Sequence, residues 1–461
     1  MCKLDSRSQI VKGSAFAGDS EPSSASSRLI SWSELSRHNT VKDAWIAIKG
    51  KVYDVTEFAK RHPGGDIIFT AAGTDATDVY AGFHASTDAW RLLPPLCVGV
   101  INQASEKRLD GVDASYVRDV LEMRKQVQAL RLFDSSKLFY AYKILSNVSI
   151  CALSATIALA FPSSSFACFV AALLMALFWQ QCGWLAHDFL HHQVFVNRGI
   201  NNLFGLLIGN IFQGFSVSWW KNKHNHHHAV PNVTDAPSGG DPDIATMPIL
   251  FWSEKLVEGE DLDKLPRWML RNQATLYWPI LCMARTSWVM QSLLYQATAP
   301  NPHVTSYILY VLEVLGLATH HVLFLLLVKK IAITGSIANA LLFMFASQAL
   351  GGVLLGVVFA VGHNAMDVLT IDELRAVDFI RLQVRTTRNV SPHWFTDWFT
   401  GGLNYQIEHH IFPTVPRHHL PKLAKILRAF CAKHEIPYAS ETLIEGNKAV
   451  CNILRVVSKV A

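Results

Sequence analysis

Four long apolar stretches restrict the possible folds of this 461-residue chain more than any other feature. Each is about long enough to cross the ~30 Å hydrocarbon core of a bilayer as a helix. Half of the residues are hydrophobic and only 17% are charged, a balance that is unusual for a soluble enzyme. The sequence therefore predicts a helical membrane part built from two hairpins. The stretches are residues 144–161, 166–185, 307–328 and 337–361.

Two further apolar stretches, 200–214 and 276–294, are interrupted by polar residues. We expect interfacial or re-entrant helices there rather than spans. An even number of spans then separates the N-terminal part from residues 187–228 and from residues 406–410, so all three share one side of the membrane. That side is predicted to be cytosolic, because the N-terminus has no apolar segment typical of a cleavable signal peptide. Two lysines on the 329–336 turn oppose the positive-inside tendency but do not overturn this topology.

The remaining composition excludes several classes of protein. The net charge of +5 comes without a dense Lys/Arg block, so we expect no nucleic-acid surface. The eight cysteines are spread singly, without a Cys-x-x-Cys pair, which argues against a disulfide framework or a zinc ribbon.

The chain divides into five predicted regions. Residues 1–28 are rich in Ser, Gly and charge and are predicted to be a disordered tail. Residues 29–103 form a compact soluble domain with short strands at 44–48 and 51–55. A helical connector (104–140), a membrane domain (141–440) and a C-terminal tail (441–461) follow. Within the membrane domain, residues 420–430 form a basic amphipathic helix that either lies on the membrane surface or packs on the protein.

Two histidines of the soluble domain could ligate one iron. His62 opens His-Pro-Gly-Gly and His84 closes Gly-Phe-His. A haem iron that only transfers electrons needs both axial positions filled by side chains, so that O₂ cannot bind. Paired glycines let a backbone turn approach the ring. As bare chemistry, such a pair of histidines is a weak signal.

The residues around this pair resemble cytochrome b5. The resemblance implies an α+β haem domain in which His62 and His84 are the axial ligands of haem b. The segments that carry it are Trp32, residues 44–46, 52–56, 62–65, 72–77 and 83–84.

Three histidine clusters lie beside the apolar hairpins, at residues 187–192, 224–228 and 406–410. On a helix, His187 and His191 share one face, as do His224 and His228. Histidine at membrane depth is costly unless it binds something. The clusters therefore predict a metal centre with eight imidazoles, from His187, His191, His192, His224, His227, His228, His409 and His410.

Eight imidazoles are too many for one tetrahedral zinc ion and suit two metal ions of higher coordination number. Imidazole binds iron, copper, zinc and nickel, so the ligand type does not choose the metal. An attached haem domain does favour a redox metal. Two irons with O₂ can remove hydrogen from an unactivated methylene.

The whole arrangement, from about residue 30 to 440, resembles the membrane fatty acid desaturases with their three histidine boxes. It is most similar to the front-end desaturases, which carry an N-terminal cytochrome b5 domain and a glutamine, here Gln406, at the start of the third box. Residues 179–186, 219–223 and 240–243 strengthen the likeness, and the first box, His-Asp-Phe-Leu-His-His, is similar to that of delta-6 members.

This resemblance implies an all-α polytopic membrane domain of four transmembrane helices, with the boxes in a cytosolic cap that holds two iron ions. Gln406 would be a ligand or a hydrogen-bonding partner of one. His363 is a plausible further ligand, with Asn364 its rival. By helix geometry His226 points away from the His224/His228 face. His320, inside a span, is expected to be hydrogen-bonded in the core, and Glu313 to face the bundle interior.

The expected reaction is O₂-dependent desaturation of an unsaturated C18 acyl chain at the delta-6 position. Electrons would pass from NADH through a cytochrome b5 reductase to the haem and then to the irons. The substrate is either an acyl-CoA or a fatty acyl lipid, and the resemblance implies the endoplasmic reticulum membrane. Alternatives are a delta-5 acyl desaturase, a delta-8 sphingolipid desaturase or a hydroxylase. An alternative from another class is a membrane haem protein that only relays electrons, with vestigial or zinc-bound clusters.

Overall fold

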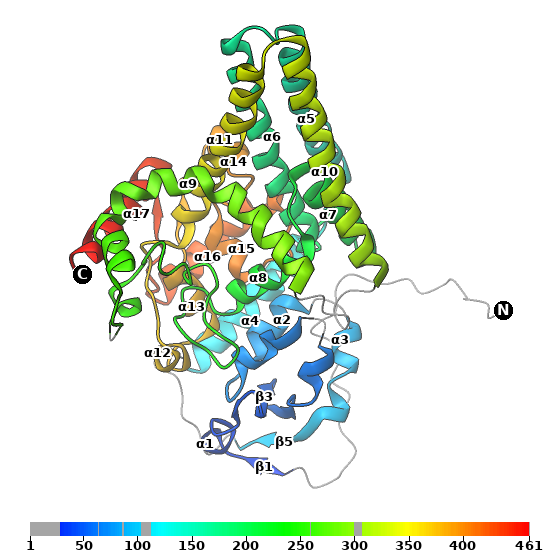
Figure 1. Cartoon of the computed structure of the whole chain (residues 1–461). Coiled ribbons are helices and arrows are strands. Elements are labelled where there is room, and N and C mark those ends of the chain that lie inside the picture. The colour runs from blue at the N-terminus through cyan, green and yellow to red at the C-terminus, as the bar shows by residue number, and fades with distance from the viewer. Residues whose placement is uncertain are drawn as a thin grey trace, which may run out of the picture.

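A computed structural model describes residues 28–62, 64–84, 87–102, 112–258, 260–298 and 307–460. The predicted disordered tail, apart from residue 28, lies outside the described residues. Figure 1 shows a small domain with a sheet at the bottom, a layer of shorter helices above it, and long helices rising from that layer to the top.

The N-terminal domain is built on a five-stranded sheet of order β1-β5-β4-β3-β2. Its central hairpin turns at Lys49 and Gly50, which both have positive φ (51° and 74°), as a two-residue turn between twisted strands requires. The two strands predicted from alternation are confirmed as β3 and β4. Elements of this domain are β1 Leu29–Ile30, α1 Trp32–Leu35, β2 Asn39–Thr40, β3 Asp43–Ile48, β4 Lys51–Asp54, η1 Phe58–Arg61, η2 Gly65–Ala71, α2 Thr77–Phe83, α3 Thr87–Arg91, η3 Pro94–Leu96 and β5 Cys97–Ile101.

Within the described residues, four helices are long and apolar enough to cross a membrane, and they form the two predicted hairpins. They are α5 Lys137–Ala160, α6 Ser165–Leu190, α10 Tyr307–Thr334 and α11 Ile337–His363. The hairpins are joined at their turns, where the Asn339 side chain donates to the Pro162 carbonyl (2.9 Å) and Ser165 Oγ lies 2.8 Å from Asn339 Oδ1. Many large apolar side chains of these helices point outward, among them Leu138, Phe166 and Tyr307, as a lipid-facing surface requires.

Helices α6 and α11 also carry predicted metal ligands at their inner ends, His187 and His363. From Phe178 to Leu190, every residue of α6 is buried. Close packing of α11 on α9 depends on Gly352, because a Cβ there would lie 2.2 Å from the Leu281 carbonyl oxygen. The first histidine cluster is thereby carried inside the protein at the end of a span.

The other helices form a cap around the inner ends of the spans. Neither of the two interrupted apolar stretches, 200–214 and 276–294, is among the four candidate spans. Residues 200–214 run from α7 into a π-helical segment, and residues 276–294 lie in the single helix α9, which contains Pro279. These elements are α4 Ala114–Ala129, α7 Arg198–Leu206, η5 Leu207–Gln213, α8 Val217–Ala229, η6 Glu254–Leu256, α9 Lys264–Thr298, α12 Ile371–Arg375, α13 Phe379–Thr386, β6 Asn389–Val390, α14 Trp394–Phe399, α15 Gln406–Ile411, η7 Arg417–His419, α16 Leu420–Lys433, β7 Ser440–Glu441, α17 Leu443–Val457 and η8 Ser458–Val460.

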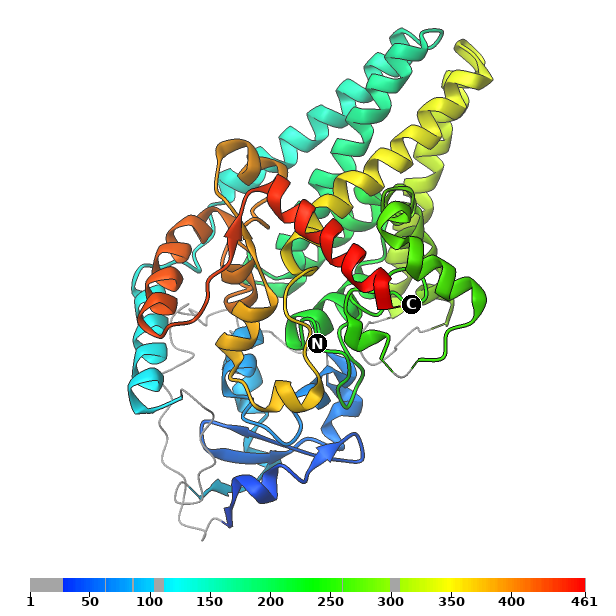
Figure 2. The same cartoon turned by 90° about the vertical axis from the view of Figure 1, so that its left-hand side faces the viewer.

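Of the last two α-helices, α16 was predicted from the sequence and α17 was not. The apolar face of α16 is buried with α4 and α15, with Leu423 and Leu427 fully enclosed, so of the two alternatives the structure supports packing on the protein. The segment expected to be a tail contains α17, which packs on α9 and α11 and crosses the molecule in red in Figure 2. A capping box of Thr442 and Glu445 starts α17.

Two predicted interior polar groups are confirmed. Glu313 is 3% exposed and accepts hydrogen bonds from Ser216 Oγ (2.7 Å) and Gln296 Nε2 (2.8 Å). His320 lies 2.9 Å from the Ile211 carbonyl oxygen through Nδ1 and 3.0 Å from Arg285 through Nε2. Both groups tie the membrane helices to the cap and belong to its hydrogen-bonded core.

Candidate haem site and metal centre

The two histidines singled out in the N-terminal domain face each other. His62 follows η1 and His84 follows α2, and their ring centroids are 6.1 Å apart, which leaves room for one metal atom between the rings. His62 Nδ1–H donates to the Gly65 carbonyl (3.2 Å) and His84 Nδ1–H to the Tyr80 carbonyl (3.0 Å). Both Nε2 atoms are thereby left as the ligand atoms.

The surroundings of this pair suit a neutral, ligating imidazole. Burial lowers the pKa of His62 below its ordinary value and lowers the pKa of His84 to about 4, so both rings are neutral near pH 7. A Cβ at Gly64 would lie 2.8 Å from Ile67 and 2.9 Å from the His62 ring. A larger residue at this position would therefore displace the His62 ring or Ile67.

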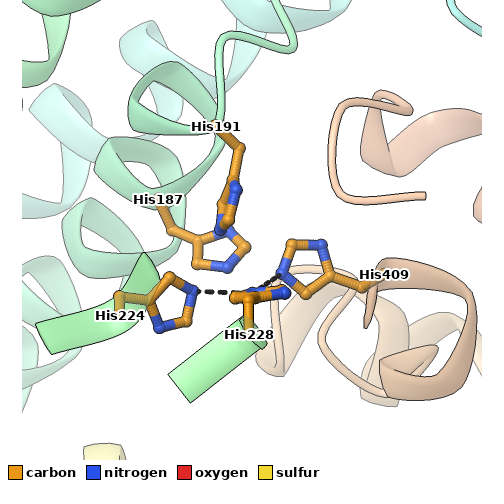
Figure 3. A group of neighbouring side chains, drawn as sticks. All are labelled: His187, His191, His224, His228 and His409. Carbon is orange, nitrogen blue, oxygen red and sulfur yellow. Dashed lines mark hydrogen bonds between the residues drawn. The ribbon is translucent and has the colours of Figure 1, made fainter. Parts of the chain in front are cut away.

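Five buried histidines form a first group in the cap, which we call the five-histidine group. They come from α6, its C-terminal end, α8 and α15, segments far apart in the sequence (Figure 3). Each offers one ring nitrogen, and these nitrogens all lie within 4.8 Å of one another. The members are His187, His191, His224, His228 and His409.

Several buried ring nitrogens of this group lack a hydrogen-bond donor or acceptor nearby in the described part of the chain. Among the described residues, both ring nitrogens of His187 and Nε2 of His191 have no hydrogen-bond partner. His228 Nε2 faces His224 Nε2 at 3.1 Å and His409 Nε2 at 3.0 Å. Burial holds the pKa values of His224, His228 and His409 well below the ordinary value, so these rings are neutral. The Nε2 atoms that face one another therefore do not take up additional protons that could form hydrogen bonds between them. A bound metal cation would satisfy their lone pairs.

A second group, the three-histidine group, adjoins the first and consists of His227, His363 and His410. Gln406 reaches into it, with Nε2 2.8 Å from His363 Nε2 and 3.4 Å from His410 Nε2. The other amide atom, Gln406 Oε1, is buried and has no hydrogen-bond partner in the part of the chain that the structure describes. A half-turn of this amide would present the oxygen to the group as a fourth ligand atom.

Each histidine of the second group is oriented from outside. His227 Nδ1 lies 2.9 Å from Asp241 Oδ2, His363 Nδ1 lies 3.1 Å from the Thr386 carbonyl, and His410 Nδ1 lies 2.8 Å from Gln383 Oε1. These acceptors fix Nδ1 as the protonated nitrogen and turn every Nε2 inward. Burial alone would lower the pKa of His227, but Asp241 and Asp243 together raise it above the ordinary value.

Most of the residues that orient these histidines were not predicted from the sequence. Asp241 belongs to the Gly-Asp-Pro-Asp stretch that strengthened the resemblance, but nothing in the sequence indicated that it orients a histidine. Gln383 carried no signal. Glu408, inside the third cluster, accepts from Asn389 (2.7 Å) and Tyr438 (2.7 Å) and so anchors α15. A fully buried ion pair between Asp188 and Arg417 ties the first cluster to the segment after the third.

His192 requires a correction, because the structure places it in neither group. Helix α6 ends at Leu190, and His192 has a left-handed backbone (φ 57°) that turns the chain away. Its Nε2 lies 3.1 Å from Asn202 Oδ1 and 3.4 Å from Lys221 Nζ. His226 points away as expected, toward the Gly239 carbonyl (2.8 Å). Asn364, the alternative ligand to His363, lies in the wall of a cavity that adjoins both groups.

A cavity of about 210 Å³ adjoins both groups. Histidines of each group line it, and aromatic and aliphatic side chains make up much of the remaining wall. Polar side chains, including Lys223, Asn232 and Asp243, also line it. The cavity can therefore hold an apolar chain against the two groups. Its apolar lining includes Trp219, Trp220, Leu281, Trp288 and Phe359.

We expect Asp241→Asn to weaken metal binding at the three-histidine group by about 10–100-fold, because His227 loses the carboxylate that orients it. Competition with a chelator during metal titration would measure the change. Asp261→Asn is the matched control, since the Asp261 side chain is fully exposed. Equal affinities for the two variants would contradict a role for Asp241 in holding this site.

Comparisons with known proteins agree with this geometry. Residues 164–442 match the family model described as fatty acid desaturase, and residues 31–102 match the model described as cytochrome b5-like heme/steroid binding domain. The chain is similar to an acyl-lipid (9-3)-desaturase of Physcomitrium patens, with 39% identity over 93% of this chain and 78% of that protein. It is similar to a Delta(8)-fatty-acid desaturase of Euglena gracilis (34% identity, 90% and 96%). It is also similar to the Delta(6)-fatty-acid desaturase fat-3 of Caenorhabditis elegans (31%, 87% and 93%).

Proposed function

This chain belongs to the fatty acid desaturase family and carries a fused cytochrome b5-like domain, and from that premise we propose that it inserts a cis delta-6 double bond into an unsaturated C18 acyl chain. As a front-end desaturase it is an oxidoreductase that acts on acyl lipids with O₂. The cytochrome b5 domain implies haem, and the histidine clusters are consistent with a di-iron centre. The observation that carries the proposal is a cavity with a partly apolar wall that touches both histidine groups.

We assign the metal ligands as follows. The five-histidine group holds one iron, and the three-histidine group holds the other with Gln406 as a further ligand or hydrogen-bonding partner. The unpartnered ring nitrogens and the unpartnered Gln406 Oε1 support this assignment. His62 and His84 hold the haem, and their facing rings and outward Nδ1 bonds support that role.

When bound, the irons supply the oxidising chemistry with O₂ that removes two hydrogens from adjacent methylenes, with two electrons and two protons completing the reduction of O₂ to water. The chain's own residues place the substrate. Trp219, Trp288 and Phe359 line the cavity and would pack against the acyl chain and position it beside the histidines. The polar lining at Lys223 and Asn232 suits the end of the substrate that carries the head group.

Electrons reach the haem from NADH through a separate cytochrome b5 reductase in this proposal. The sheet domain, α8 and α15 all lie at one end of the two helical hairpins (Figure 1). Because α8 and α15 carry the second and third histidine clusters, this supports placing the haem domain and the histidine groups together on the cytosolic face. We propose the endoplasmic reticulum membrane as its location, on the basis of the family resemblance and the cytosolic placement of the haem domain.

Delta-6 regiochemistry is supported by the His-Asp-Phe-Leu-His-His first cluster and by the relative named as a Delta(6)-fatty-acid desaturase. Yeast that expresses the chain and is fed linoleic or α-linolenic acid should accumulate acids with a new delta-6 double bond, located by mass spectrometry of derivatised esters. Cells that express the His409→Ala variant provide the background. A new double bond at delta-5 or delta-8, or one confined to sphingoid bases, would refute the delta-6 assignment and leave the family intact.

A further inference from the structure

We propose that Phe83 forms the contact through which the haem domain passes electrons to the five-histidine group, and that the Asp78–Arg124 ion pair holds the domain in this position. The proposal rests on the electron-transfer function proposed above. It identifies side chains that serve the transfer without ligating either metal.

Phe83 joins the two sites directly. It precedes His84, the second haem ligand, in the chain. Its ring meets the His228 ring edge to face, with centroids 6.3 Å apart and an angle of 88° between the planes. One residue therefore separates an axial ligand of the haem from a member of the five-histidine group. Electron tunnelling slows steeply with distance, so this contact is the place to look for the route.

His228 is suited to receive the electron for both groups. It belongs to the five-histidine group, and its ring also stacks on His410 of the three-histidine group, with centroids 4.1 Å apart and 15° between the planes. In each transfer one electron would pass from ferrous haem, held by His62 and His84, to a ferric ion held by the histidine groups, so that the haem would become ferric and that ion ferrous. NADH and the reductase then reduce the haem again, and two such transfers supply one reaction with O₂.

Besides the Phe83–His228 contact, other contacts of the described residues hold the haem domain against the cap. Segment η2 lies against α8, the helix of the second histidine cluster. Arg198 Nη2 donates to the Phe83 carbonyl at 3.4 Å. Arg124 of α4 pairs with Asp78 of α2 at 2.8 Å, with side chains only 8% and 30% exposed. In Figure 1, α2 lies above the strands of the sheet, beside α4 and below α8. A pair so little exposed fixes orientation more firmly than a surface pair does.

The test uses the full-length protein with its haem and iron. The haem is reduced by NADH and reductase, and its reoxidation by O₂ in the presence of substrate is followed by stopped-flow absorbance. Phe83→Leu, which keeps an apolar side chain but removes the ring, should slow reoxidation several-fold. The haem spectrum and the rate of haem reduction by the reductase should be unchanged.

The ion pair is tested by charge reversal. Asp78→Arg should slow reoxidation roughly tenfold, because two arginines then face each other at the interface. The double variant Asp78→Arg/Arg124→Asp should recover most of the rate. Asp43→Arg is the matched control, because Asp43 is an acidic residue of the same domain that pairs with His38 instead. A second readout needs no iron: Asp78→Arg should speed hydrogen exchange in residues 77–83 and 217–229 of the metal-free protein.

The outcomes separate this proposal from the function it rests on. If the wild type makes product and Phe83→Leu reoxidises as fast as the wild type, the proposed route is wrong and the desaturase assignment stands. If Asp78→Arg behaves like Asp43→Arg in both readouts, the ion pair does not hold the domain. If the wild-type haem is not reoxidised and no product forms, the proposed function itself is wrong.

Discussion

Replacing His409 with alanine should abolish desaturation while the haem remains fully reducible. His409 Nε2 lies 3.0 Å from His228 Nε2, and its ring centroid lies 4.4 Å from that of His187, so it is central to the five-histidine group. Loss of a residue that merely orients a ligand costs about 10–100-fold in metal affinity or activity, and loss of a ligand should cost more. Product would be measured by gas chromatography, iron by mass spectrometry and haem by absorbance.

His226→Ala is the matched control for this experiment. It removes a histidine from the same chain segment as the second cluster, but one whose ring points to the Gly239 carbonyl. His192→Ala tests the correction made above, because its ring lies against Asn202 and outside both groups. Both variants should retain iron. A His409→Ala protein with normal iron and product, or equal iron loss in all three variants, would contradict the assignment of the five-histidine group.

Replacing His84 with alanine should remove the haem and reduce product to background, while the iron of the two histidine groups stays bound. His62 and His84, whose ring centroids are 6.1 Å apart, are the proposed haem ligands, and with one of them gone the haem iron would lose one of the two side chains that hold it. The b-type absorbance of the purified protein and the product formed with NADH and reductase measure the two effects. Iron beyond the haem, determined on the same sample, shows whether the membrane part remains loaded.

His38→Ala controls for disturbance of the haem domain. This histidine stacks on Trp45 with ring centroids 3.5 Å apart and pairs with Asp43, so its loss disturbs the sheet without touching the haem ligands. It should keep haem and product. Full product from the haem-free His84→Ala protein would show that the fused domain is not the electron donor.

Local patterns predicted the parts of the fold that local physics decides. Alternating residues marked β3 and β4, and apolar length marked the four spans. The spacing of His187 and His191, and of His224 and His228, predicted shared helix faces, and both pairs do lie in one group. Those patterns depend only on strand or helix geometry, which neighbouring residues determine.

The sequence did not predict the contacts that depend on tertiary packing. Successive residues of a helix are rotated by about 100°, so His227 lies beside the His224/His228 face rather than on it, and it joins His363 and His410 instead. Only the packing of α8 against α11 and α15 shows which group it enters. The end of α6 at Leu190, which sends His192 aside, depends on the loop that follows. Gln383 acts on His410 across the fold, and no motif signals such a contact.

The central claim is that this chain holds a haem and two further irons, and the metal and haem content of the detergent-purified full-length protein tests it most directly. The account predicts about two irons beyond one b-type haem for each chain. Haem with zinc, or with no further metal, that persists after reconstitution with iron and reductant would contradict the di-iron centre and favour a membrane protein that only relays electrons.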